Sequence, residues 1–163
     1  MITQPEPVLR AAARAVVLDP DDRVLLVHFR NPQRDACWWA TPGGGLDDGE
    51  THEEALRREL DEEAGLSAFE LGPCIWFREH VFVWGERRIR QRERYYLVRA
   101  ASAELAPALS ADVLVSEGIQ AHRWWTLADL LSSEERFAPS RLASLLRSLL
   151  RDGPPRTPFD VGA

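Results

Sequence analysis

Apolar runs in the first 40 residues are short, rich in β-branched side chains and interrupted by turn-forming residues. The segment ARAVVLDPDDRVLLVHF has Pro20 and its neighbouring aspartates between two such runs, a pattern typical of two strands around a turn. The next segment, CWWATPGGGLDDGET, predicts a short aromatic strand that passes into a glycine-rich loop.

A helix is predicted directly after this loop. Thr51 is a suitable N-cap, and Glu54, three positions later, completes a capping box. Gly65 is suited to the position that follows a helix C-terminus. We therefore expect the helix to run from about His52 to Ala64.

The second half of the chain predicts a hairpin, another strand and two helices. CIWFREHVFVW and RIRQRERYYLVRA flank GERR as two long strands around a turn. HRWWTLADLL predicts a strand at Arg123 to Thr126 and a short helix, and APSRLASLLRSLL has the leucine spacing of a terminal amphipathic helix. The expected fold class is α/β, with a mixed sheet between helices. Residues 1–152 would form a single domain and residues 153–163 a loose C-terminal tail.

Length and composition are consistent with one soluble domain. The chain has 163 residues, of which 45% are hydrophobic, enough for one sizeable core. Cys37 and Cys74 form no CxxC pair and no signal-peptide pattern opens the chain, so we expect a reducing, cytoplasmic location. The apolar runs are far shorter than the roughly 20 residues of a membrane-spanning helix, so no membrane association is expected.

The negative charge of the chain is concentrated in one segment. The formal net charge is −6, which argues against general binding of nucleic-acid backbones. Residues 43–66 contain nine acidic residues and two arginines, a net of −7, so the rest of the chain carries +1. The acidity is therefore a property of one site.

The predicted helix gathers three of these acids on one face. With Leu56 at 0° and about 100° per residue, Leu60 lies at about 40°, on the apolar stripe. Glu63, Glu59 and Glu62 lie at about 340°, 300° and 240°. Like charges at this spacing repel one another, so we expect a cation beside them. Carboxylates without His or Cys partners suit Mg²⁺ or Mn²⁺; the alternative is a solvated, charged helix face.

The same segment matches a known signature, G-x5-E-x7-R-E-U-x-E-E-x-G-U, in which U is an apolar residue. The matching positions are Gly44, Glu50, Arg58, Glu59, Leu60, Glu62, Glu63, Gly65 and Leu66. The chain thereby resembles the Nudix hydrolase (MutT-like) family. The resemblance implies the α/β/α sandwich of that family, and a full match reduces the weight of the solvated-face alternative.

The resemblance also implies a metal site. Glu59 and Glu63 would be the principal ligands, Glu62 would share the site, and the backbone carbonyl of Gly43 or Gly44 would contribute. Mg²⁺ is the expected cofactor, and Mn²⁺ is its expected substitute.

Other positions of the motif are expected to hold the site together. The resemblance implies that Glu50, in the loop, pairs with Arg58, on the helix, and that Gly44 and Gly65 are structural. Some family members carry a further Glu in a loop before an aromatic strand, where it reaches the metals or the attacking water. Glu117, in the segment SEGIQAHRWWTL, is expected to take that place.

The function implied by the resemblance is hydrolysis of a nucleoside diphosphate linked to a further group X. Metal-activated water would attack phosphorus, and Glu59 and Glu117 are the candidate bases. The expected partner is a small nucleotide or diphosphate, and homodimerisation is left open. One alternative is a nucleotide-binding or sensor domain without turnover, although such domains usually lose signature carboxylates. Another is an isomerase of small diphosphates, which would need a catalytic cysteine, whereas both cysteines lie in apolar sequence typical of a core.

Substrate recognition lies outside the signature. Some aromatic side chains could stack on a base, but aromatic residues in strands are more often core; the candidates are Trp38, Trp39, Trp76, Phe77 and Tyr95. Alternation places Trp38 and Trp39 on opposite faces of their strand. Four arginines could contact phosphates or form a solvated strand face: Arg78, Arg90, Arg92 and Arg94. His80 and His122 are expected at the surface or the core edge. Val81 stands where ADP-ribose hydrolases of the family carry proline, so X is not assigned.

Overall fold

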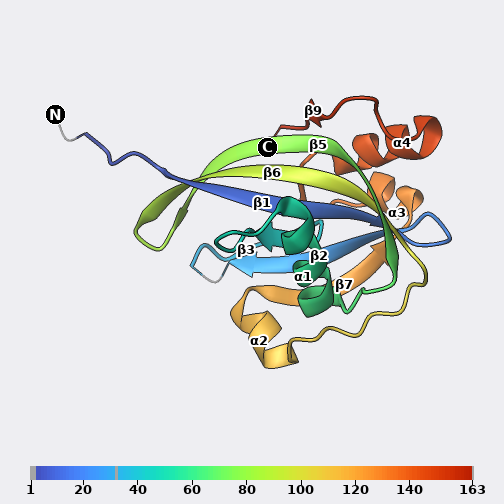
Figure 1. Cartoon of the computed structure of the whole chain (residues 1–163), viewed down its shortest axis with the longest axis horizontal. Helices are drawn as coiled ribbons and strands as arrows, with labels where there is room; N and C mark the ends of the chain where they lie inside the picture. The colour runs from blue at the N-terminus through green and yellow to red at the C-terminus, as the bar shows by residue number, and fades with distance from the viewer. Residues whose placement is uncertain (1–2, 32, 163) are drawn as a thin grey trace.

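A computed structural model describes residues 3–31 and 33–162 of the chain. This part of the chain contains nine strands and four helices (Figure 1). In chain order they are β1 (Val8–Leu18), β2 (Val24–Asn31), β3 (Ala36–Ala40), β4 (Gly43–Gly45), α1 (His52–Ala64), β5 (Phe69–Trp84), β6 (Arg87–Ala100), α2 (Ala111–Ser116), β7 (Ile119–Trp125), α3 (Leu127–Ser132), β8 (Phe137–Ala138), α4 (Leu142–Asp152) and β9 (Phe159–Asp160).

The strands form one mixed sheet that opens in the middle. Its order is β8-β3-β2-β1-β6-β5-β9, with β1 parallel to β6 and antiparallel to β2. Strands β1 and β2 pair at Leu18 and Val24, beside their connecting turn. Further along, β4 pairs with β1 and β7 pairs with β2. The opening between β1 and β2 therefore places the glycine strand β4 inside the sheet.

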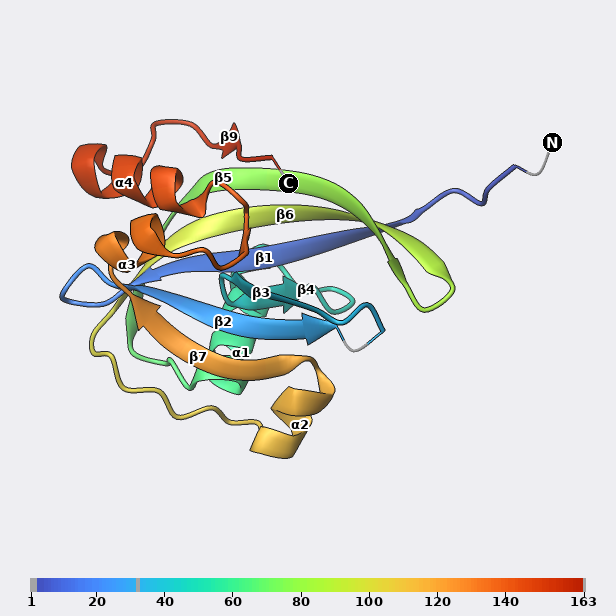
Figure 2. The ribbon, with the colours of Figure 1, turned by 180° about the vertical axis from the view of Figure 1, so that it is seen from behind.

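Helices cover both faces of this sheet, as the α/β/α expectation requires. In β1, Ala13, Ala15 and Val17 belong to the core cluster that packs against α1. Val16 and Leu18 belong to the cluster on the opposite face, under α3 and α4. This alternation follows from the two-residue period of a strand. Figures 1 and 2 show α1 on one side of the sheet, with α3 and α4 on the other.

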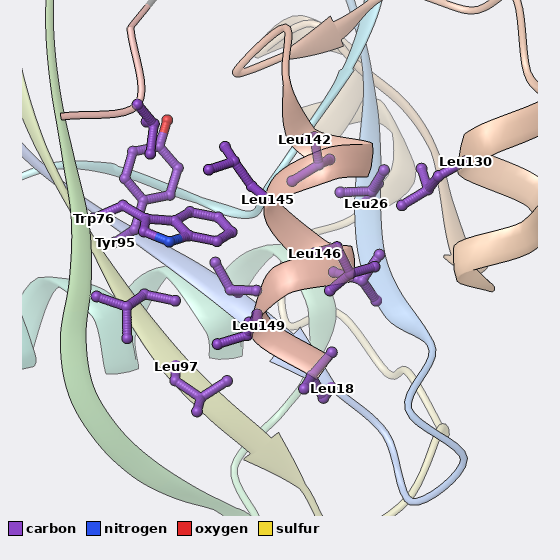
Figure 3. Packing of buried hydrophobic residues seen from close by; sticks show 14 of the residues in the cluster. Leu18, Leu26, Trp76, Tyr95, Leu97, Leu130, Leu142, Leu145, Leu146 and Leu149 are labelled. Atoms are coloured by element: carbon purple, nitrogen blue, oxygen red, sulfur yellow. The ribbon is translucent and has the colours of Figure 1, made fainter. Parts of the chain in front are cut away.

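The core under α4 is built from leucines and aromatic residues (Figure 3). Four α4 residues are buried at the i, i+3, i+4 and i+7 spacing of an amphipathic helix: Leu142, Leu145, Leu146 and Leu149. They pack with Trp76 and Tyr95 from the β5–β6 hairpin. The predicted terminal helix and the predicted hairpin are thereby confirmed.

Helix α1 has the predicted bounds and caps. The Thr51 side chain accepts from the Glu54 N–H, and the Glu54 side chain accepts from the Thr51 N–H, which is a full capping box. Gly65 has a left-handed φ of +68° and closes the helix. A Cβ at Gly65 would also overlap the Ala106 backbone, so this position requires glycine for two reasons.

Three predictions about the elements were incomplete. The glycine run is in part a strand, because Gly43–Gly45 pair with β1. Strand β7 begins at Ile119 instead of Arg123, and helix α2, capped by Ser110, precedes it. Its six residues carry too little periodicity to stand out in the sequence.

The segment after α4 was predicted to be a loose tail, and this was wrong. Phe159 and Asp160 form β9, which pairs with β5 in parallel. Val161 is fully buried, and its N–H donates to the Phe77 carbonyl. The exposed edge of β5 offers free backbone groups, which explains why a proline- and glycine-containing segment becomes ordered there.

The two cysteines are free thiols, and their settings differ from the predicted core. Cys37 is exposed and Cys74 is half-buried. Cys37 lies opposite Arg30 in the β2–β3 pair, near the end of β3, whereas Trp39, two residues further along, is buried. Among the described residues, no helix is long and apolar enough to span a membrane.

Candidate active site

The glycine strand and helix α1 bring backbone and carboxylates into direct contact. Glu59 lies so close to Gly44 that a Cβ there would be 2.6 Å from its Oε1. The Gly43 N–H donates to Glu63 Oε2 at 3.4 Å. Gly43 has φ +138°, and a Cβ there would collide with the Ala13 carbonyl. Glycine at position 44 thus lets Glu59 approach the backbone, and glycine at position 43 lets β4 lie close to β1.

Glu59 and Glu63 form a carboxylate pair next to this strand. Glu63 is only 5% exposed. Burial raises the pKa of Glu63 well above its ordinary value, and the neighbouring Glu59 raises it further, while the charge of Arg14 acts in the opposite direction. A buried pair of like charges is unfavourable without a cation, so the pair is suited to bind one.

Arg58 holds the loop to the helix through the expected ion pair with Glu50. Its Nε and Nη2 donate to the two Glu50 oxygens, each at 2.9 Å, a bidentate arrangement. Nη2 also donates to the Gly45 carbonyl at 3.1 Å. The hydrogen bonds from Arg58 and from the Asp47 N–H lower the pKa of Glu50 to about 2.

The same guanidinium also contacts the carboxylate face, which the sequence did not indicate. Arg58 Nη1 lies 3.0 Å from Glu59 Oε1 and 3.4 Å from Glu62 Oε2. Arg58 therefore joins the loop acid to two of the candidate metal ligands.

Replacing Arg58 with Ala is expected to lower both the melting temperature and activity. The change leaves Glu50 without its partner and releases Glu59. The folded pKa of Glu50 lies below its ordinary value of 4.5. The Glu50–Arg58 pair therefore stabilises the folded state fully above pH 4.5, and this stabilisation is lost as the pH falls toward 2. The difference in melting temperature should therefore be full at pH 7 and narrow near pH 3 in thermal scans.

Arg57→Ala is the matched control, because Arg57 makes an exposed ion pair with Glu53 on the same helix. Such pairs contribute little, so this variant should melt like the wild type. An Arg58→Ala protein with unchanged melting temperature and lost activity would instead indicate a direct contact with substrate.

Glu117 is the C-cap residue of α2, beside the carboxylate face. Its N–H donates to the Val113 and Leu114 carbonyls. Burial raises the pKa of Glu117, and the charges of Glu59 and Glu62 raise it further. Glu117 is thus close enough to interact with the signature acids from another element, although it ends a helix instead of lying within a loop.

Replacing Glu117 with Gln is expected to lower kcat by roughly a hundredfold or more, the scale of a general base or metal ligand. Steady-state kinetics at saturating substrate and metal would measure this. Asp112→Asn, which removes an exposed acid from the same helix, should leave kcat nearly unchanged. A fall of less than about threefold for Glu117→Gln would make Glu117 a surface residue and leave Glu59 as the candidate base.

The donor set fits a small divalent cation. Within residues 3–31 and 33–162, no three His, Cys, Asp or Glu side chains already form a metal-binding cluster. Glu59 and Glu62 both contact Arg58 Nη1, Glu59 at 3.0 Å and Glu62 at 3.4 Å. Mg²⁺, however, keeps several waters and typically binds one or two carboxylates. Glu59, Glu63 and the Gly43 carbonyl would meet that requirement.

Two charged residues near the site had no assigned role in the sequence. Glu93 is 1% exposed. Arg78, a candidate either for a phosphate contact or for a solvated strand face, is instead buried and donates to Glu93 at 3.0 Å. Arg14 donates to the Gly43 carbonyl at 3.1 Å and lies 3.5 Å from Glu93. The sequence signal that could have identified Glu93 is its position in β6, because it lies two residues from Gln91 and from Tyr95 and shares their buried side of the strand.

The aromatic residues divide between core and surface. Trp39, Trp76 and Tyr95 are buried core residues, whereas Phe77 is 43% exposed. Trp38 stacks on Phe29, on the face opposite Trp39, as alternation requires. The histidines lie where they were expected. His80 is partly exposed and contacts Glu93, and His122 is half-buried.

Comparison with known proteins identifies the family. The NUDIX domain matches residues 8–148 of the chain. An RNA pyrophosphohydrolase of Sphingopyxis alaskensis is 28% identical over 153 residues, covering 88% of this chain and 91% of that protein. An ADP-ribose pyrophosphatase of Methanocaldococcus jannaschii is 42% identical over 50 residues, 31% of this chain and 29% of that protein.

A solved structure shares the architecture. The MutT NUDIX hydrolase from Burkholderia pseudomallei superposes with a TM-score of 0.57 at 26% identity, covering 85% of this chain and 96% of that one. The mixed sheet between helices and the match over residues 8–148 lead to the same conclusion. The chain belongs to the NUDIX domain family.

Proposed function

We propose that this chain is a Mg²⁺-dependent hydrolase that cleaves the diphosphate linkage of a nucleoside diphosphate derivative. The observation that carries the proposal is the Glu59–Glu63 carboxylate pair, held against the glycine strand beside Arg58. All signature carboxylates are present, which favours turnover over a sensor domain without activity. The free cysteines agree with a reducing cytoplasm.

The residues of the site have complementary tasks in this reaction. Mg²⁺ bound by Glu59, Glu63 and the Gly43 carbonyl would neutralise the diphosphate and lower the pKa of water. Glu59 or Glu117 accepts the proton of the attacking water. The water oxygen forms a bond to phosphorus while the bridging P–O bond breaks, and the leaving phosphate departs with the electron pair. Arg58 keeps Glu59 in place and limits repulsion among the carboxylates.

The substrate class is a nucleotide with a phosphoanhydride. The names of the relatives differ in the group attached, which is RNA in one and ADP-ribose in another. Their shared chemistry is cleavage between two phosphorus atoms, and the proposal is confined to this bond. The isomerase alternative is disfavoured because burial raises the pKa of the Cys74 thiol, and because Cys37 lies opposite Arg30 of β2, where none of its described contacts is to Glu59 or Glu63.

The experiment that tests the proposal is a substrate panel with Mg²⁺. Nucleoside triphosphates, ADP-ribose, dinucleoside polyphosphates and 5′-triphosphorylated RNA would be incubated with the protein, and the products separated by chromatography. We expect phosphoanhydride cleavage in at least one class, strongly reduced in a Glu63→Gln sample prepared in parallel. Binding of one of these compounds without any cleavage would favour the sensor alternative.

A further inference from the structure

A buried carboxylate outside the signature organises the face of the sheet behind the glycine strand. The Oε1 atom of Glu93 accepts hydrogen bonds from Arg78 Nη2 at 3.0 Å and Gln91 Nε2 at 2.8 Å, and His80 Nε2 is also 2.8 Å away. Its Oε2 atom accepts from the Tyr95 hydroxyl at 2.8 Å. So many partners fix the carboxylate in one orientation.

The charge of Glu93 is retained in spite of its burial. Burial acts to raise the pKa of Glu93, but Arg14, His80 and Arg78 outweigh it and hold the pKa well below the ordinary value. An ionised carboxylate at this depth requires its cationic partners, and one of them, Arg14, extends toward the candidate active site.

Arg14 ties the loop before α1 to strand β1. Its Nη1 donates to the Gly43 carbonyl at 3.1 Å and to the Thr41 carbonyl at 3.4 Å. The Pro42 carbonyl between them accepts from the Ala15 N–H at 2.9 Å. Three consecutive carbonyls are therefore held by two adjacent residues of β1.

These contacts continue to the signature helix. Gly43, whose carbonyl binds Arg14, donates its own N–H to Glu63. The same peptide segment is thus bound on one side through Arg14 to Glu93, 3.5 Å away, and on the other side to a candidate metal ligand. A carbonyl oxygen has two lone pairs, so the bond from Arg14 leaves one for a further partner.

We propose that Glu93 and Arg14 are a positioning pair for the hydrolytic site. Glu93 orients the Arg14 guanidinium, and Arg14 orients the Gly43 peptide, so that its N–H meets Glu63 and its carbonyl faces the metal position. This inference rests on the proposed function and adds two residues outside the signature to the machinery that supports it.

The two possible roles of Arg14, as a positive charge and as a positioning group, predict opposite changes in cation affinity when Arg14 is removed. If Arg14 acted only as a positive charge near Glu59 and Glu63, its removal would strengthen cation binding. If it positions Gly43, removal weakens cation binding. We expect Arg14→Gln and Glu93→Gln each to weaken Mn²⁺ binding by about tenfold, as loss of groups that orient ligands does. Mn²⁺ titration followed by electron paramagnetic resonance measures the affinity.

Two further proteins are titrated with Mn²⁺, the Arg14→Gln/Glu93→Gln double variant and a control at a neighbouring arginine. Because the two residues act in series, the double variant should bind Mn²⁺ about as weakly as either single one. Arg10→Gln is the matched control, since Arg10 lies on the same strand and its guanidinium lies over Gly45. It removes the same charge near the same loop and should bind Mn²⁺ as tightly as the wild type or more tightly.

A second readout uses the metal-free protein. The ¹³C shift of the Gly43 carbonyl and the ¹⁵N shift of its amide should change in Arg14→Gln and Glu93→Gln and stay the same in Arg10→Gln. Since no metal or turnover is involved, this result is independent of the proposed function, which the Glu63→Gln kinetics test separately.

Should Arg14→Gln fail to fold, Arg14→Lys keeps the charge but lacks the planar fork of the guanidinium. It should also weaken Mn²⁺ binding and shift the Gly43 signals. Wild-type Mn²⁺ affinity in a folded Arg14 variant, or Gly43 signals that do not change, would overturn the proposal.

Discussion

Glu63→Gln is expected to lower kcat by orders of magnitude, because it removes a ligand of the metal that would activate the attacking water, while the fold stays intact. Gln keeps the shape of Glu63 but cannot supply a negative oxygen to a divalent cation. Glu59→Gln should have an effect of the same order. Because the two residues act as one unit, the fall in kcat of the double variant should be far smaller than the product of the two single-variant falls.

Stability separates this effect from misfolding. The folded pKa of Glu63 is raised by burial and by Glu59, so the contribution of this carboxyl to stability is full below its unfolded pKa and is lost as the pH rises through its folded pKa. Glu63→Gln should therefore melt at the same temperature as the wild type or higher in metal-free buffer. Calorimetry at pH 7 would measure this.

The matched control is Glu53→Gln, the same chemical change on the exposed face of the same helix. Glu53 pairs only with the exposed Arg57 among its described contacts, so its turnover should stay within about twofold of the wild type. Near-normal turnover in Glu63→Gln would refute the assignment of the carboxylate pair.

Removal of divalent metal is expected to reduce turnover to the background rate. Among the described residues, the cationic side chains next to the carboxylate pair are Arg58, which contacts Glu59, and Arg14, which contacts the Gly43 carbonyl. Neither arginine can activate water. Excess EDTA should therefore abolish activity, and added Mg²⁺ or Mn²⁺ should restore it. Full turnover in excess EDTA would contradict the metal assignment.

Metal binding should also be visible without substrate. A ligand that binds only the folded state stabilises it by mass action, and the cation relieves repulsion between Glu59 and Glu63. Mg²⁺ should raise the melting temperature of the wild type and of Glu53→Gln, but much less that of Glu63→Gln. Equal shifts in all three proteins would place the bound cation elsewhere.

Features determined by local sequence were predicted well. The bounds of α1 and its capping box follow from Thr51, Glu54 and Gly65, which act within a few residues of one another. The ion pair between Glu50 and Arg58 was expected from the signature, and it is present. The β5–β6 hairpin followed from alternation around Gly85.

Features that depend on long-range packing were not predicted. The C-terminal segment is ordered because it pairs with the free edge of β5. No local pattern in residues 153–163 predicts this pairing. Contacts of Arg14 with Gly43 and Glu93 join three strands that are distant in the chain. Sequence reasoning did not single out Glu93, and only the fold shows that Arg14 and Arg78 compensate its charge.

The most direct test of the central claim is hydrolysis in H₂¹⁸O with Mg²⁺. The best substrate of the panel would be incubated with the wild type, Glu53→Gln and Glu63→Gln, and the products analysed by mass spectrometry. Attack of water on phosphorus predicts one ¹⁸O atom in one phosphate product per cleavage, with similar amounts of labelled product from the wild type and Glu53→Gln and far less from Glu63→Gln in the same time. Products without ¹⁸O at phosphorus, or as much labelled product from Glu63→Gln as from the wild type, would contradict the account.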